Sequence, residues 1–107
     1  MNAQKNDAAG SAGKTPPGPP KFPLGALVMT PGAEQALPFT EICAALLRHL
    51  RGDWGELDPE DLEANNAAVI CGSRLLSAWS TREKRIRFWI ITESDRSVTT
   101  VLLPSEY

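Results

Sequence analysis

The sequence predicts an α+β fold in which N-terminal helices pack on a small C-terminal antiparallel three-stranded meander. Apolar residues recur at helical spacing in the middle of the chain. After Gly72 the pattern changes to three short runs rich in β-branched and aromatic residues. The letters TREK and ESDR separate these runs, and both strings are typical of turns. We therefore expect the helices to come first and the sheet to follow.

The first part of the chain, residues 1–21, is expected to be a disordered tail that precedes a single domain over residues 22–107. It contains four prolines and three glycines but almost no large apolar side chain. Such a stretch buries too little surface to offset the entropy of ordering it. The rest of the chain is long enough to form one core without disulfides or metals.

Capping residues place the first two helices. Thr30 followed by Pro31 is typical of a helix start, and Pro38 interrupts that helix, so we expect it to be brief. A well-marked helix then begins near Phe39. Cations fall in its last turn, and Gly52 follows at the position where a C-terminal capping glycine belongs.

A third helix is predicted to begin at Asp58, with Pro59 in its first position, and to end at Gly72. Its apolar stripe is weak. The pair Asn65–Asn66 has low helix propensity, which indicates that another part of the structure requires an amide there.

The sheet is expected to have two different faces. In a final hairpin with its tip at residues 93–96, Ile90 lies opposite Thr99 on an almost wholly apolar face that the helices cover. The other face is mixed and includes Trp89, so it is either covered by another segment or is a surface for a partner. Residues 24–29 are short and apolar and are a candidate for a fourth strand.

Several function classes find no support in the sequence. No run approaches the roughly 18 apolar residues of a membrane span, and no secretory signal precedes the domain. Cys43 and Cys71 are the only cysteines, so we expect two reduced thiols in a cytoplasmic protein. With a single His and no paired-cysteine spacing, we expect no metal. Since no phosphate-binding glycine motif is present, we expect no cofactor.

Charge is unevenly distributed along the chain, although the net charge is only −2. Residues 53–63 carry six acids and no base, whereas six bases and four acids follow Gly72. The molecule is therefore expected to be bipolar. The sequence pI of about 5.3 disfavours nucleic acid as the main partner.

His49 is the candidate for acid–base chemistry, because it is the only side chain whose unperturbed pKa lies near neutrality. Asp53 could orient it, and arginines, Arg96 among them, could stabilise charge on a phosphate. The structural interpretation is a histidine at a helix C-terminus, satisfied by the last carbonyl groups. Trp54 could stack a base or instead fill the core.

The hairpin tip is the other candidate site. Polar side chains gather there, and we single out Glu93, Asp95, Thr99 and Thr100 as binding residues together with Trp54 and Trp89. The alternative is a plain turn in which Asp95 caps backbone amides. A Thr99 that faces the core needs a buried partner for its hydroxyl, so we expect the tip and the helix end at His49 to form one polar cluster.

Three motifs carry a resemblance: His-x-x-Gly-Asp-Trp-Gly at residues 49–55, Leu-Ser-Ala-Trp at 76–79, and Trp-Ile-Ile-Thr-Glu-x-Asp-Arg from residue 89. Together they resemble a family of small uncharacterised bacterial proteins, often encoded on plasmids and genomic islands. The resemblance covers residues 24–107 and implies one domain but no established activity. At the level of fold, helices followed by a meander are similar to the barnase and RelE superfamily of RNA-cleaving toxins.

Two function classes follow. The first is a non-catalytic interaction or regulatory module of a bacterial mobile element, which acts through the mixed sheet face and the hairpin tip on a protein partner or a second copy. The alternative is a small RNA-directed nuclease that uses His49 and arginines. Whether the protein is an enzyme is left open, and the acidic pI favours the module.

Overall fold

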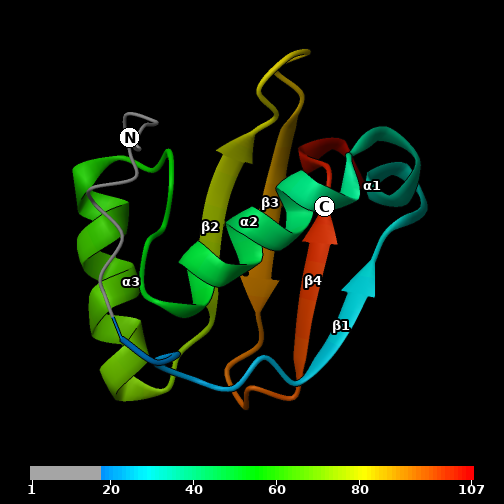
Figure 1. Ribbon diagram of the computed structural model, residues 1–107. Coiled ribbons are helices and arrows are strands. Elements are labelled where there is room, and N and C mark those ends of the chain that lie inside the picture. The colour runs from blue at the N-terminus through cyan, green and yellow to red at the C-terminus, as the bar shows by residue number, and fades with distance from the viewer. Residues whose placement is uncertain (1–17) are drawn as a thin grey trace.

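A four-stranded mixed sheet forms the centre of the structure, a computed structural model that describes residues 18–107. The strands are β1 (Ala26–Met29), β2 (Leu75–Ser80), β3 (Arg87–Thr92) and β4 (Val98–Leu102), in the spatial order β1-β4-β3-β2 (Figure 1). The predicted α+β class is confirmed. The sheet has four strands rather than three, however, because the segment at residues 24–29 supplies β1, and β1 runs parallel to β4.

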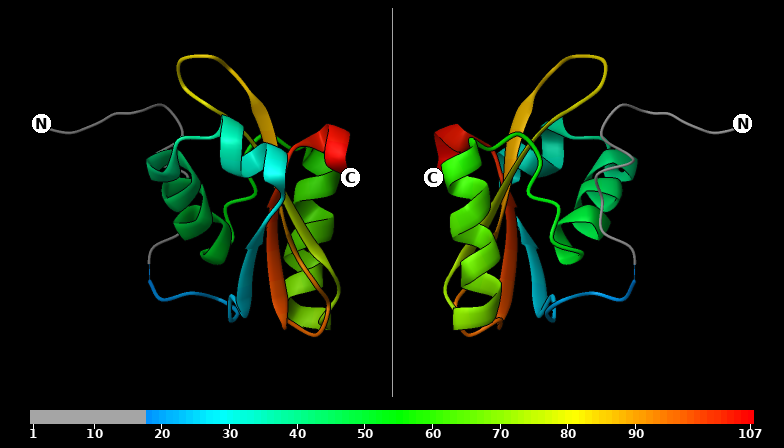
Figure 2. Two further views of the ribbon diagram at one scale, coloured as in Figure 1. Left: turned by 90° about the vertical axis from the view of Figure 1, so that its right-hand side faces the viewer. Right: turned by 90° about the vertical axis from the view of Figure 1, so that its left-hand side faces the viewer.

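Three helices, α1 (Pro31–Ala36), α2 (Phe39–Leu50) and α3 (Pro59–Cys71), precede β2, and a short 3₁₀ turn, η2 (Pro104–Glu106), follows β4. Figure 2 shows α1 and α2 on one side of the sheet and α3 with η2 on the other. The local signals explain the helix ends: Thr30 accepts a bond from the N–H of Ala33, and Gly72 is left-handed with φ 78°. None of the described helices is long and apolar enough to cross a membrane.

The start of the described chain is attached to α2, since the N–H of Lys21 donates to the carbonyl oxygen of Leu50 at 2.8 Å. The predicted tail at residues 1–21 lies, up to residue 17, outside the described residues. From Lys21 the chain leads to Phe22, whose side chain is buried against the core.

The register of the final hairpin differs from the prediction by two residues. Ile90 pairs with Val101 and Thr92 with Thr99, whereas we expected Ile90 opposite Thr99. The tip lies one residue further along because Asp95 accepts the N–H of Ser97 at 3.0 Å, which prevents Ser97 from pairing with Thr92. A two-residue shift leaves every side chain on its predicted face.

The main core lies between α1, α2 and the apolar face of the sheet, which we call the first face; the opposite face, which carries Trp89, is the second face. α2 turns an apolar stripe inward, as the spacing of Ile42, Ala45 and Leu46 requires. These side chains meet Phe88, Ile90 and Val101 of the sheet. A second cluster continues from Leu75 toward α3 and includes Phe22, Trp54 and Ala68.

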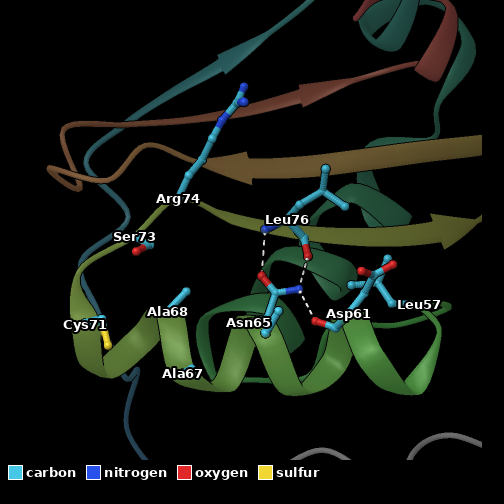
Figure 3. Close-up of a pocket in the computed structure, with 10 residues that line it drawn as sticks. Leu57, Asp61, Asn65, Ala67, Ala68, Cys71, Ser73, Arg74 and Leu76 are labelled. Carbon is cyan, nitrogen blue, oxygen red and sulfur yellow. Dashed lines mark hydrogen bonds between the residues drawn. The ribbon is translucent and has the colours of Figure 1, made fainter.

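The outer edge of β2 is covered. Asn65 of α3 accepts the N–H of Leu76 at 3.0 Å and donates to its carbonyl oxygen at 2.9 Å, as Figure 3 shows. Two residues further along β2, the N–H of Ala78 donates to the carbonyl oxygen of Trp54 at 3.1 Å, and the carbonyl oxygen of Ala78 accepts from the N–H of Glu56 at 2.8 Å. Asn65 therefore replaces a neighbouring strand, which explains why an amide is needed in this helix.

Candidate functional site

His49 lies in the core, where none of its surface is exposed. Its Nδ1 is 2.7 Å from the hydroxyl of Ser77, and its Nε2 is 2.9 Å from the hydroxyl of Thr92. The rings of Phe22 and Trp54 lie edge-on to the imidazole, each with a centroid distance of 5.4 Å. Both nitrogens are thus occupied by partners from the sheet.

One end of this network determines the tautomer of His49. Thr99 donates its hydroxyl proton to the carbonyl oxygen of Leu24 at 2.7 Å. In the 2.8 Å bond between Thr92 and Thr99, Thr99 must therefore be the acceptor and Thr92 the donor. Since the Thr92 proton is used there, the Thr92 oxygen accepts from His49, and Nε2 carries the ring proton.

The other end of the network fits a neutral His49. The indole N–H of Trp79 donates to Ser77 at 2.7 Å. In a neutral ring whose proton is on Nε2, Nδ1 accepts the hydroxyl proton of Ser77. Burial, and secondarily the positive charge of Arg96, lowers the pKa of His49 to about 3. Each of these side chains therefore has its hydrogen-bond partners within the network, and no ring nitrogen of His49 is left for a substrate.

The Gly52–Gly55 turn holds the next two predicted residues. Trp54 is buried, and its indole N–H donates to Asn66 at 2.8 Å, so its ring fills the core between α2 and α3. The carboxylate of Asp53 accepts from Arg48 at 2.8 Å and from the N–H of Gly55 at 3.0 Å. Asp53 thus orients Arg48 and the turn.

The tip of the β3–β4 hairpin is held by its own side chains. The carboxylate of Asp95 accepts hydrogen bonds from both the hydroxyl group of Ser97, at 2.6 Å, and the backbone N–H of Ser97. These bonds lower the pKa of Asp95, the side-chain bond most. This is the arrangement of a plain turn.

Arg96 belongs to the same tip but reaches away from it, toward α3. Its guanidinium donates to the carbonyl oxygens of Ser73 at 2.6 Å, Ala68 at 3.1 Å and Glu93 at 3.1 Å, and it lies over the ring of Phe22 at 5.6 Å. Arg96 therefore connects the hairpin tip to the end of α3. It meets no carboxylate in the described part of the chain.

The second face of the sheet carries a group of side chains that we call the Trp89 cluster: Arg74, Trp89 and Tyr107. The rings of Trp89 and Tyr107 meet edge to face at 5.6 Å. Arg74 donates to the Tyr107 hydroxyl at 2.9 Å, and its guanidinium carbon is 5.4 Å from that ring. Trp89 is half-buried, whereas 69% of Tyr107 is exposed. Thr100 is half-buried on the same face.

Tyr107 reaches this face because the chain turns back after β4. In η2, Glu106 accepts from the N–H of Gly32 at 2.9 Å, from the N–H of Leu103 at 3.1 Å and from the hydroxyl of Thr30. These bonds, that from Thr30 most, lower the pKa of Glu106. The terminal turn is therefore fixed to the start of α1 with its aromatic ring over the sheet.

A groove of about 460 Å³ adjoins the Trp89 cluster (Figure 3). Small residues of α3, Ala64, Ala67 and Ala68, form one wall, and Leu76 of β2 lies opposite. Arg74 lines the groove as well, so the groove and the cluster share one surface. Glu93 joins this surface through a 3.7 Å contact with Arg74.

A larger groove of about 730 Å³ lies between α2 and the β2–β3 hairpin. Two acids of its lining are already paired: Asp53 with Arg48, and Glu56 with Arg87 at 2.8 Å. Its two aromatic residues, Trp79 and Phe88, are both buried, and Trp79 lies beneath Arg48. Because its charges are mixed and both of its aromatic rings are buried, this groove is the weaker candidate.

Sequence reasoning placed only Trp89 of the three cluster residues on this face, because Arg74 was considered only among the arginines that could stabilise charge on a phosphate. Trp89 was predicted from the alternation of β3. Arg74 stands in phase with Leu76 and therefore on the same face, a signal that was present in the sequence. Tyr107 had no such signal, because its position depends on the turn at η2. Of the predicted tip residues, Glu93 and Thr100 lie on this surface, whereas Thr99 is buried in the network of His49.

Among residues 18–107, no three His, Cys, Asp or Glu side chains gather to hold a metal ion. The thiols of Cys43 and Cys71 are free. No protein-family model, curated protein or solved structure matches the chain. The resemblance described above therefore stays a prediction, and function has to be inferred from this geometry.

Proposed function

We propose that the protein is a non-catalytic interaction module whose contact surface is the second face of the sheet, with the Trp89 cluster at its centre. One observation carries the proposal: a tryptophan, a tyrosine and an arginine lie together and remain partly exposed on a regular sheet. These three residue types dominate the energetically important positions of protein interfaces. The partner we propose is a protein.

Contacts on several sides hold the cluster in place, which favours binding because less side-chain freedom is lost on association. Trp89 lies on an inner strand and pairs with Ala78 on one side and Leu102 on the other. Tyr107 is held by Arg74 and by the terminal turn. The adjoining groove gives a partner side chain a place to insert beside the two rings.

The nuclease alternative has less support. His49 would have to lose a satisfied hydrogen bond before it could act as an acid or base, and burial opposes its protonation. Arg96 is engaged with three carbonyl oxygens. That the module belongs to a bacterial mobile element is a proposal that rests on the resemblance alone.

Exchange of Tyr107→Glu tests the proposal, with Leu47→Glu as the matched control. Leu47 is also an exposed apolar residue, at 56%, but it lies on α2. The immobilised full chain would be used to capture partners from a lysate of the source organism. We expect a partner that wild type and Leu47→Glu retain and that Tyr107→Glu binds about 30-fold more weakly, as for an interface residue worth about 2 kcal/mol.

Equal thermal stability of Tyr107→Glu and Leu47→Glu would show that the weaker binding of Tyr107→Glu comes from the changed surface and not from unfolding. A partner that binds both variants equally would exclude the Trp89 cluster as the contact site.

A further inference from the structure

The outer edge of β1 is open. The N–H of Ala26 donates to Ser97 at 2.9 Å, and the N–H of Thr30 donates to Val101 at 3.0 Å. Alternate residues of a parallel strand bond to the same neighbour, so the N–H and C=O groups of Leu27 and Met29 point away from β4. No group among residues 18–107 bonds to them, and Figure 1 shows no element beyond β1.

Proteins usually protect such an edge with a charge, a proline, a bulge or a covering segment. β1 has none of these: its sequence is Ala-Leu-Val-Met, and its four residues pair with β4 without interruption. Leu27 is 39% exposed on one face, and Val28 is 45% exposed on the other. The opposite edge, at β2, is by contrast covered by Asn65 and the Trp54–Glu56 segment.

We propose that β1 pairs antiparallel with β1 of a second copy of this chain, so that the two four-stranded sheets become continuous. About a two-fold axis at Val28, the outward groups of Leu27 meet those of Met29 in the other copy. Each of these pairs exchanges both backbone bonds. Val28 then lies opposite Val28 of the other copy on the second face.

A second copy is the occupant that the edge fits best, because the pairing is self-complementary. All outward groups of Leu27 and Met29 find a partner, and the exposed apolar side chains of both faces are covered. The strand and its flanking residues Gly25 and Thr30 carry no charge, so two copies meet without like-charge repulsion. A strand of four residues is short, and we therefore expect a concentration-dependent dimer. This inference does not rest on the function proposed above.

Substitution of Val28 by a charged residue tests both the proposed pairing of the two β1 strands and its register. In sedimentation experiments on the full chain, we expect wild type to dimerise with rising concentration. Val28→Lys and Val28→Glu should each be monomeric, because two like charges would meet at the axis. An equimolar mixture of the two should form a dimer again, since Lys then lies opposite Glu. Leu47→Lys and Leu47→Glu serve as controls and should behave like wild type.

Three results would overturn the inference. The first is a wild-type chain that stays monomeric up to about 1 mM, where even weak contacts are populated. The second is a mixture of the Val28 variants that stays monomeric although each variant is folded. The third is a dimer that persists in both Val28 variants and is lost in Tyr107→Glu, which would place the contact on the second face.

If the Val28 variants do not fold, Leu27→Pro and Leu27→Ala replace them. Proline removes only an outward N–H and leaves the bonds to β4, as is tolerated in edge strands. Leu27→Pro should be monomeric while Leu27→Ala still dimerises, and a Leu27→Pro dimer of unchanged affinity would overturn the inference.

Discussion

The buried hydrogen-bond chain through His49 runs in one direction only. Each hydroxyl donates once and accepts once, from the indole of Trp79 at one end to the carbonyl oxygen of Leu24 at the other. A fully satisfied polar network in a core allows one arrangement of the surrounding elements and disfavours others. His49 therefore helps to fix the position of α2 on the sheet.

Lowering the pH should destabilise the protein through His49. In the unfolded chain this residue has its ordinary pKa of 6.5, whereas the folded protein takes up the proton only near pH 3. The unfolded state therefore binds the proton first, and the stabilisation present above pH 6.5 is lost as the pH falls. We expect a loss of about 2 kcal/mol between pH 7 and pH 5 in urea unfolding.

An NMR titration of the single imidazole provides the direct measurement. A ring that titrates near 6.5 in the folded protein would contradict the buried network. His49→Gln should remove the pH dependence of stability in this range.

Thr92→Val removes the acceptor of the imidazole N–H without changing the shape of the side chain. The orphaned donor should lower the free energy of unfolding by about 2 kcal/mol, measured by urea denaturation. Thr100→Val is the matched control, because Thr100 lies half-buried on the second face and valine suits a strand. Its effect should stay within about 0.5 kcal/mol, and equal effects at the two positions would show that the network adds nothing.

At the scale of the elements, the two edges of the sheet are treated differently. β2 is closed by the amide of Asn65 and by the turn around Trp54, whereas β1 is left open. The amide imitates a strand, since it offers one acceptor and one donor at the spacing of a backbone residue. The hydrogen bonds of the Asn65 amide to β2 therefore explain this residue better than its low helix propensity does.

Asn65→Ala should lower the free energy of unfolding by about 1–3 kcal/mol, because the N–H and C=O of Leu76 lose their partner. The bare β2 edge should also promote association at high concentration. Thermal melts and light scattering would measure the two effects. Glu63→Ala, an exposed position of the same helix, should change neither, and a stable monomeric Asn65→Ala would show that water replaces the amide.

Local signals predicted the elements well, because helix ends depend on a few neighbouring residues such as Thr30 and Gly72. The faces of β3 and β4 were also predictable from alternation. Their register was not, since it depends on how Asp95 bonds within the tip. The parallel pairing of β1 with β4 and the return of Tyr107 onto the sheet join distant parts of the chain, and no local pattern indicates such contacts.

At the scale of the whole molecule, Arg96 connects parts that are far apart in the sequence. It joins the β3–β4 tip to the last turn of α3 and covers the ring of Phe22. Hydrogen bonds from a charged group to carbonyl oxygens are stronger than neutral ones. One side chain thus holds the helix, the hairpin and the first described segment together.

Arg96→Ala should therefore loosen α3 and lower the free energy of unfolding by about 2 kcal/mol. Hydrogen exchange should show earlier opening of residues 68–73 than of the central strands. Arg82→Ala, which removes an exposed arginine of the other hairpin, should leave both measurements unchanged. Unaltered exchange at residues 68–73 in Arg96→Ala would mean that α3 is held by its apolar contacts alone.

The parallel pairing of β1 with β4 has a consequence for biosynthesis. Ala26 leaves the ribosome long before its partner Val98, so the nascent chain carries β1 without a neighbour while the three helices and two other strands are made. Synthesis of the residues between Ala26 and Val98 takes seconds, which is much longer than a helix or a hairpin needs to form. Throughout that interval Ala-Leu-Val-Met has two bare edges instead of one. Newly made chains should therefore depend on early shielding of this segment, by α1 and α2 or by a chaperone, more than the finished protein does.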